Sequence, residues 1–252
     1  MLNYIKSEFY RVTHSLSTYI TLGIFLGLSL LVNCGLAIIG AANPSFAYAN
    51  TSFSMQFLMQ LPTIFVCAAP ILVYVLYDDL GKNGTLKNAV AFGISREKLL
   101  LGQFIISLTF CLFVMLATLA VYFASAYAFL KYDPTIPSSE VMREALCVLL
   151  PAIAAMVLAI VCANVTSKGV LGIAIWMVIY YFVPYVCRWI GYQVDFFAKM
   201  AEWMPMTFMD MQGATEIFWQ TKEGVEKCLI SGAAGIVIFA VVGWLLLRRK
   251  EI

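Results

Sequence analysis

Long apolar runs separated by short polar segments dominate the pattern of this chain. Each run is free of formal charge and close to or beyond the ~20 residues that a helix needs to cross the hydrocarbon core of a bilayer. The pattern therefore predicts six membrane-spanning helices. The runs are Tyr19–Ile39, Phe53–Tyr77, Leu99–Leu130, Ala145–Val165, Val170–Cys187 and Cys228–Leu247.

Residues 1–17 have a different pattern, with apolar residues at three- and four-residue steps. This periodicity is typical of an amphipathic helix, and such a helix lies in the headgroup plane with its cations near anionic lipid. A simple extension of the first span is the alternative. The stripe consists of Leu2, Ile5, Phe9, Val12 and Leu16.

Prolines and run length modify the second and third spans. Pro62 and Pro70 interrupt the second span, and each proline removes a backbone donor and tends to kink a helix. The third run would be about 48 Å long as a helix, so it overshoots the bilayer or tilts. A polar loop is expected over Lys131–Glu144, before the fourth span.

The segment Arg188–Lys227 mixes charges with tryptophans at 189, 203 and 219. Aromatic residues next to short apolar stretches favour a segment that sits at the membrane interface and dips into it. We expect a re-entrant pair of short helices here, and a soluble microdomain outside the membrane is the alternative.

Composition agrees with a lipid environment, since 62% of the 252 residues are hydrophobic and 12% are charged. A soluble domain is nearer half apolar and a quarter charged. We therefore predict an all-α polytopic membrane protein, with residues 1–252 forming one transmembrane domain. The N-terminus shows no small-residue cleavage pattern of a secretory signal.

The distribution of the 16 Lys and Arg residues predicts the orientation. With six spans, both termini lie on one side, and ten of the cations fall there. The positive-inside rule places that side in the cytosol. The densest charged segment, Asp78–Lys98, then faces the cytosol too. These ten cations are Lys6, Arg11, Lys82, Lys87, Arg96, Lys98, Lys168, Arg248, Arg249 and Lys250.

Several kinds of chemistry are disfavoured. Seven cysteines never form a CxxC pair, and a single histidine, His14, cannot build a metal site with scattered thiols. Cys187 and Cys228 flank the last large loop and are the one pair to test for a disulfide. The spans hold essentially no ionisable residue, which argues against an ion-coupled transporter. No G-x4-G-K-[ST] phosphate loop is present, so the chain would not hydrolyse ATP alone.

We call Asp78–Lys98 the charged loop. Thr85 is placed to cap a short helix over Leu86–Phe92, and Ser95 to cap the start of the third span. A short helix presented at the membrane surface suits docking into a groove of a partner protein. An ordinary solvated loop that obeys the positive-inside rule is the alternative.

The run GKNGTLKN at residues 81–88 and the run GISREK at residues 93–98 resemble the first cytosolic loop of type-2 ABC exporter permeases. The layout of an interfacial helix, six spans and a segment before the sixth is similar to that bacterial family over the whole chain. The resemblance implies a coupling helix that docks on a separate ABC ATPase subunit, which would bind ATP and Mg²⁺, so no cofactor is expected on this chain. The ATPase-coupling residues would be Gly84, Thr85, Leu86, Lys87, Asn88, Gly93, Ser95 and Arg96.

The same resemblance implies a second permease subunit, identical or similar, an extracellular re-entrant gate over 188–227, and location in the bacterial cytoplasmic membrane. Asn33, Tyr180 and Tyr181 are candidates for the substrate path, although such groups also serve as interhelical hydrogen bonds. An amphipathic or lipophilic cargo, such as an antimicrobial peptide in export or self-immunity, is expected. Lipid is the other expected contact, and no nucleic acid is. The alternative is a non-transporting membrane sensor or assembly subunit.

Overall fold

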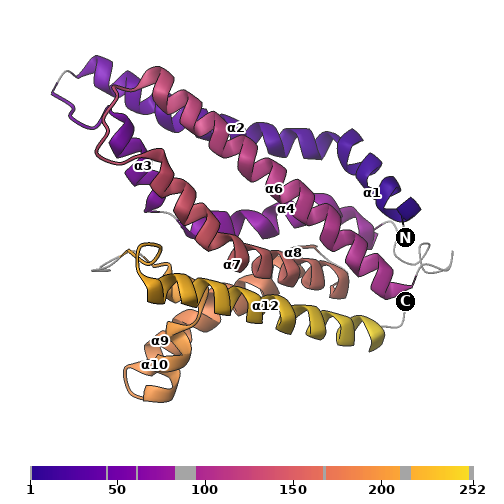
Figure 1. Ribbon diagram of the computed structural model, residues 1–252. Helices are drawn as coiled ribbons and strands as arrows, with labels where there is room; N and C mark the ends of the chain where they lie inside the picture. The colour runs from indigo at the N-terminus through magenta and orange to yellow at the C-terminus, as the bar shows by residue number, and fades with distance from the viewer. Residues whose placement is uncertain are drawn as a thin grey trace.

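The computed structural model describes residues 2–43, 45–60, 62–82, 95–166, 169–210 and 217–249, which Figure 1 shows as a bundle of helices. Within those ranges the chain is helical, without strands. Five helices are long and apolar enough to cross a membrane, or up to six if a bent pair counts as one span. The chain is therefore an all-helical, multi-pass membrane protein.

The described helices have the following bounds. In chain order they are α1 (Leu2–His14), α2 (Leu16–Ala42), α3 (Thr51–Met59), α4 (Thr63–Lys82), α6 (Arg96–Phe129), α7 (Ser138–Val165), α8 (Gly169–Met177), the π-helix η1 (Val178–Phe182), α9 (Val183–Gly191), α10 (Asp195–Glu202), α11 (Pro205–Phe208) and α12 (Lys222–Arg249).

The N-terminal amphipathic helix is present as α1, and α1 is not among the described helices that are long enough to span a bilayer. Its apolar stripe divides between two environments, because Val12 is buried while Phe9 and Leu16 are exposed. Ser15 interrupts the helix before α2 begins. The position of α1 in a headgroup plane stays a prediction.

The expected second span is broken into α3 and α4, which meet at an angle of 66°. The break falls beside Pro62, whereas Pro70 lies inside α4. A proline in the connection cannot donate its backbone nitrogen, so the chain turns there without losing a helical hydrogen bond. This break reduces the span count from six to five, unless the pair is counted together.

The fourth span begins earlier than its apolar run. We expected a polar loop as far as Glu144, and this is wrong because α7 begins at Ser138. Val141, Ala145 and Val148 are buried at three- and four-residue steps, so the buried face starts before the last charge. Glu144 consequently lies inside the helix.

Helix α7 is the centre of the bundle, and α12 packs along it in parallel orientation. Gly232 lies against Leu150 and Pro151, Gly235 against Ala154, and Gly243 against Val161. Residue numbers rise together on both helices, so the two run in the same direction. A β-carbon at position 232 would lie 2.7 Å from the Leu150 carbonyl carbon, which means that glycine permits this close approach.

The fifth apolar run continues through α8, the π-helix η1 and α9 as one candidate span. Trp176 Nε1 donates to the Ala155 carbonyl at 3.0 Å, and the Tyr180 hydroxyl donates to the Pro151 carbonyl at 2.8 Å. These two bonds attach the segment to α7. Beyond them, α9 and α10 pack against each other as a hairpin that projects away from the rest of the bundle (Figure 1). Its relation to the membrane, re-entrant or otherwise, stays a prediction.

The two chain ends lie at the same end of the bundle (Figure 1), which we call the terminal end. At the other end, the first residue of α3 is joined to the loop after α6. Thr51 N donates to the Lys131 carbonyl at 3.0 Å, and the Thr51 hydroxyl donates to the Asp133 carbonyl at 3.1 Å. The Thr135 hydroxyl and backbone N–H both donate to the Asp133 carboxylate, which lowers the pKa of that group.

Candidate functional site

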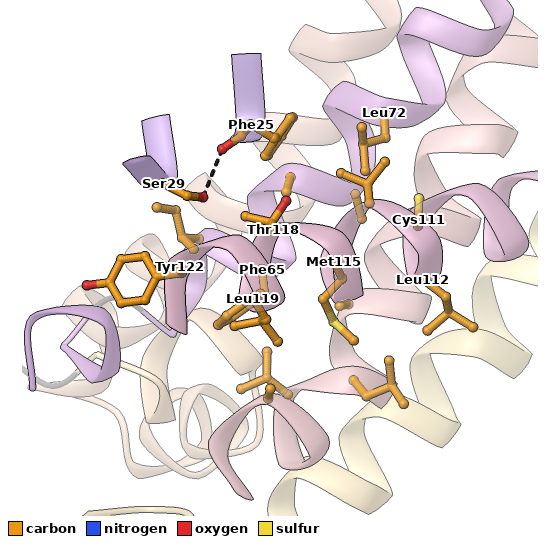
Figure 2. Close-up of a pocket in the computed structure, with 18 of the residues that line it drawn as sticks. Phe25, Ser29, Phe65, Leu72, Cys111, Leu112, Met115, Thr118, Leu119 and Tyr122 are labelled. Carbon is orange, nitrogen blue, oxygen red and sulfur yellow. Dashed lines mark hydrogen bonds between the residues drawn. The ribbon is translucent and has the colours of Figure 1, made fainter. Parts of the chain in front are cut away.

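An apolar cavity of about 220 Å³ lies between α2, α3, α4, α6 and α7, and Figure 2 shows the side chains around it. Its walls are almost wholly hydrocarbon, with aromatic rings from Phe25, Phe57, Phe65 and Tyr122. Leu28, Phe57 and Ile64 in its lining are exposed, so the cavity opens to the outside of the bundle. This cavity therefore suits an apolar group rather than water or an ion.

The break between α3 and α4 shapes one side of the cavity. Phe57 and Leu58 line it from α3, while Ile64 and Phe65 line it from α4. Phe57 and Ile64 are seven residues apart, as are Leu58 and Phe65, so the four side chains would share one face even of an unbroken helix. The 66° bend beside Pro62 lies within this face and turns the α3 pair and the α4 pair to different angles around the cavity.

Most of the few polar groups at the cavity already make hydrogen bonds within the protein. The Ser29 hydroxyl donates to the Phe25 carbonyl of its own helix at 2.9 Å, as the dashed line in Figure 2 marks. Thr118 Oγ1 is buried and has no hydrogen-bond partner among the described residues. A ligand with one acceptor atom would find one donor here, and the rest of its surface would meet hydrocarbon.

A layer of buried polar side chains adjoins the cavity at Tyr122. The Asn33 amide donates to the Tyr122 carbonyl at 3.0 Å and to Ser125 Oγ at 2.8 Å. The Ser54 hydroxyl donates to Asn33 Oδ1 at 2.6 Å, and the Tyr122 hydroxyl donates to the Ser54 carbonyl at 2.7 Å. The layer joins α2, α3 and α6, so it fixes three walls of the cavity relative to one another.

The three residues predicted for a substrate path are not brought together. Asn33 belongs to the polar layer and is 0% exposed. Tyr180 is buried against α7, whereas Tyr181 is 57% exposed on the outside of the bundle. None of the three lines the cavity. Asn33 and Tyr180 thus make the interhelical hydrogen bonds that were the alternative interpretation.

Most of the predicted coupling residues lie outside the described residues. These are Gly84, Thr85, Leu86, Lys87, Asn88 and Gly93, together with the helix expected over Leu86–Phe92. Ser95 precedes α6 as expected, but its side chain makes no capping hydrogen bond. Its carbonyl instead accepts from Leu99 N at 3.1 Å, and Arg96 is the first residue of α6.

The helices on either side of the charged loop are tied to α1 at the terminal end. Arg11 Nη1 donates to the Leu76 carbonyl of α4 at 2.8 Å, and its guanidinium lies 5.6 Å from the Tyr77 ring centre. The Tyr77 hydroxyl donates to the Gln103 carbonyl of α6 at 3.1 Å. Arg11 is held by Glu8, whose carboxylate lies 2.7 Å away. We call these contacts the clamp.

The clamp extends to two neighbouring positions. Tyr4 packs against Gly102 of α6, where a β-carbon would lie 2.6 Å from the Tyr4 ring. Burial raises the pKa of the Tyr4 phenol, and the Glu8 carboxylate adds to the shift. On the other side, Asn164 Nδ2 of α7 donates to Gln103 Oε1 at 2.6 Å. Four helices are thereby linked beside the charged loop.

Sequence reasoning missed Glu144. The expectation that spans hold essentially no ionisable residue is wrong here, because Glu144 lies in α7 with 0% exposure. Neither carboxylate oxygen has a hydrogen-bond partner among the described residues. A signal was present, since Pro137 followed by Ser-Ser-Glu marks a helix start that would have moved Glu144 into the span.

All seven cysteines are free thiols, including Cys187 and Cys228. Among the residues that the structure describes, no three His, Cys, Asp or Glu side chains are grouped so as to hold a metal ion. Comparison of the chain with models of protein families, with curated proteins and with solved structures finds no match.

Proposed function

We propose that this chain is the membrane-spanning subunit of an ATP-driven exporter, a permease of the type-2 ABC exporter kind. The proposal rests on the charged loop. The loop connects α4 to α6 at the terminal end of the bundle, where the clamp ties both helices to α1. Displacement of the loop by a partner would then move several helices together.

The clamp supports a mechanical role through its bonding pattern. Each tie joins a different pair of helices: Arg11 joins α1 to α4, Tyr77 joins α4 to α6, and Asn164 joins α7 to α6. A movement at Lys82 or Arg96 is passed on to the helices that line the cavity. Rigid-body movement of linked helices is a common form of such a change.

The partner would be a separate ABC ATPase, because the chain lacks a phosphate loop of its own. ATP-driven closure of two ATPase subunits would push on the charged loops of two permease subunits, a homodimer or a pair of similar chains. Residues 84–88 would dock on the ATPase, and Gly93, Ser95 and Arg96 would shape the return into α6. The protein would lie in a bacterial cytoplasmic membrane with both termini in the cytosol.

The cavity supports an amphipathic or lipophilic cargo, such as an antimicrobial peptide exported by or expelled from the cell. Its about 220 Å³ would hold one large apolar side chain or a short length of acyl chain rather than a whole peptide. The remainder of such a cargo would lie between two subunits. Glu144 is buried and remote from the terminal end, and among the described residues neither of its carboxylate oxygens has the hydrogen-bond partner that an ion-coupled relay would need.

The test is to express the tagged chain with its neighbouring genes, purify it in mild detergent, and measure both co-eluting proteins and ATP hydrolysis. We expect a stoichiometric ATPase with the wild-type chain. The double variant Leu86→Asp, Arg96→Glu places acids on the docking surface and should lose the ATPase. Arg143→Glu, a charge reversal at the opposite end of the bundle, is the matched control and should retain it.

Absence of a nucleotide-binding subunit in the wild-type sample, across several detergents, would overturn the transporter and favour a membrane sensor or assembly subunit. Loss of the ATPase in the Arg143→Glu control as well would show that the effect is not specific to the charged loop. Retention of the ATPase by the double variant would place the docking surface elsewhere.

A further inference from the structure

A second depression lies on the outside of the bundle, at the terminal end. It has a volume of about 790 Å³ and is lined by α6, α7 and α12. We call it the lateral groove. Its size falls within the about 300–1,000 Å³ of sites that hold drug-sized ligands. The cavity of the proposed exporter shares none of its lining residues.

The lateral groove is polar at one end and apolar along the rest. Ser95 and Glu97 lie at the start of α6, and Arg248 lies at the end of α12, so all three are at the terminal end. The deeper lining residues include Phe104, Val157 and Ile236, and these are hydrocarbon. The groove thus has the polarity of a lipid molecule, with a head and a tail.

The length of the groove matches one leaflet of a bilayer. The α12 wall from Ile236 to Arg248 rises about 18 Å, and the α6 wall from Ser95 to Phe104 about 14 Å. Half of the ~30 Å hydrocarbon core is about 15 Å. An acyl chain that starts at the polar end would therefore run along the groove to the middle of the membrane.

Cationic residues outnumber acidic ones in the sequence at the helix ends beside the groove, although its own lining holds one of each, Glu97 and Arg248. Arg248 lies 5.4 Å above the Trp244 ring, and Arg249 follows it as the last residue of α12. Arg96 and Lys98 lie in the first turn of α6, where Glu97 is the one acid. That acid accepts from Trp244 Nε1 at 2.9 Å, which ties α12 to α6 at this level. Tryptophan and arginine are typical of headgroup depth.

We propose that the lateral groove binds one anionic phospholipid of the leaflet at the terminal end. Its phosphate group would lie by Arg248, and one acyl chain would follow Leu101, Ile160 and Ala240 toward the middle of the membrane. Charge selects the headgroup, because a zwitterionic lipid brings no net negative charge to Arg248 and to the helix ends that carry the other cationic residues. The site does not depend on the transporter proposal, since a sensor or an assembly subunit would hold the same lipid.

The experiment measures lipid bound to the purified full-length chain by native mass spectrometry, after addition of equimolar phosphatidylglycerol and phosphatidylcholine. Wild type should retain one phosphatidylglycerol in preference to phosphatidylcholine. Arg248→Gln should weaken that preference about fivefold, the effect expected of one cation near a membrane surface. Arg143→Gln, at the other end of the bundle, should leave it unchanged.

A pair of filling variants locates the tail. Ala240→Phe places a ring in the groove and should abolish retention of the lipid, whereas Val241→Phe adds a similar ring on the exposed side of the same helix and should not. If Ala240→Phe does not fold, Arg248→Gln still tests the site, because it removes charge without adding volume.

Three results would overturn the proposal. Equal retention of the two lipids by wild type would remove the charge argument. Lipid loss in both Ala240→Phe and Val241→Phe, or in neither, would place the lipid outside the groove. A dimer without lipid that dissociates in Ala240→Phe would show that a second copy of the chain occupies the groove instead.

Discussion

Helices α2 and α12 have nearly the same apolar character and very different surroundings for their glycines. The mean hydropathy is 2.3 for α2 and 2.4 for α12, and in each helix 11% of the residues in the most apolar stretch are buried. On α12, Gly232, Gly235 and Gly243 all lie against α7. On α2, β-carbons added at Gly23 and Gly27 would meet nothing within 4 Å. Hydropathy therefore does not show which face of a membrane helix is already in contact.

The two helices are attached to the bundle by different means. Backbone approach attaches α12 to α7, where small residues allow extensive van der Waals contact. Polar side chains attach α2 to the bundle, since Asn33 makes hydrogen bonds to α6 and Ser54 of α3. The comparison suggests that glycine substitutions should harm α12 and polar substitutions should harm α2.

The largest effect is expected from Gly232→Leu. Its side chain would meet the Leu150 and Pro151 backbone, which cannot move aside within α7. Overpacking of this kind should lower the free energy of unfolding by about 3 kcal/mol. The measurement is thermal unfolding of the purified chain in detergent. A midpoint equal to that of wild type would mean that α12 is not held to α7 by this contact.

A smaller loss is expected from Asn33→Leu, which keeps the approximate size of the side chain and removes three hydrogen bonds. Interhelical bonds in membrane proteins average about 0.6 kcal/mol each, so the loss should be about 2 kcal/mol. The same unfolding assay applies. Thr109→Val is the control, because the Thr109 hydroxyl donates to the Ile105 carbonyl of its own helix. Equal losses of stability in both variants would show that the polar layer does not hold α2 to its neighbours.

The smallest effect on stability is expected from Gly27→Leu, because the space around this position is open. The free energy of unfolding should change by no more than about 0.5 kcal/mol. Gly23 and Gly27 have the small-xxx-small spacing that lets two membrane helices approach closely. If two permease subunits meet here, Gly27→Leu should lower the dimer fraction in crosslinking while stability is retained; a destabilisation as large as that of Gly232→Leu would contradict the comparison.

The sequence predicted the helical class and the position of each long apolar helix, because a bilayer requires about 20 apolar residues in succession. It missed boundaries set by packing. Glu144 was placed outside α7 since charge was treated as the end of the span, although burial continues to Val141. The break at Pro62 and the cavity beside it could not be predicted from the sequence. Pro62 and Pro70 both lie in the same apolar run, yet the helix is broken beside Pro62 and continuous through Pro70. The sequence also could not assign a role to the candidate path residues: Asn33 and Tyr180 make hydrogen bonds to neighbouring helices, and such bonds depend on helix packing.

The clamp also sets an order in which the protein can be assembled. Helix α1 is the first element synthesised, yet its partners Leu76, Tyr77 and Gly102 are made much later. At synthesis rates of about 5–20 residues per second, α1 waits roughly 5–20 s for them. During that interval α4 and α6 cannot cover its apolar stripe, and an amphipathic helix in this state binds the membrane surface. The clamp can therefore form only after both α4 and α6 have been inserted into the membrane.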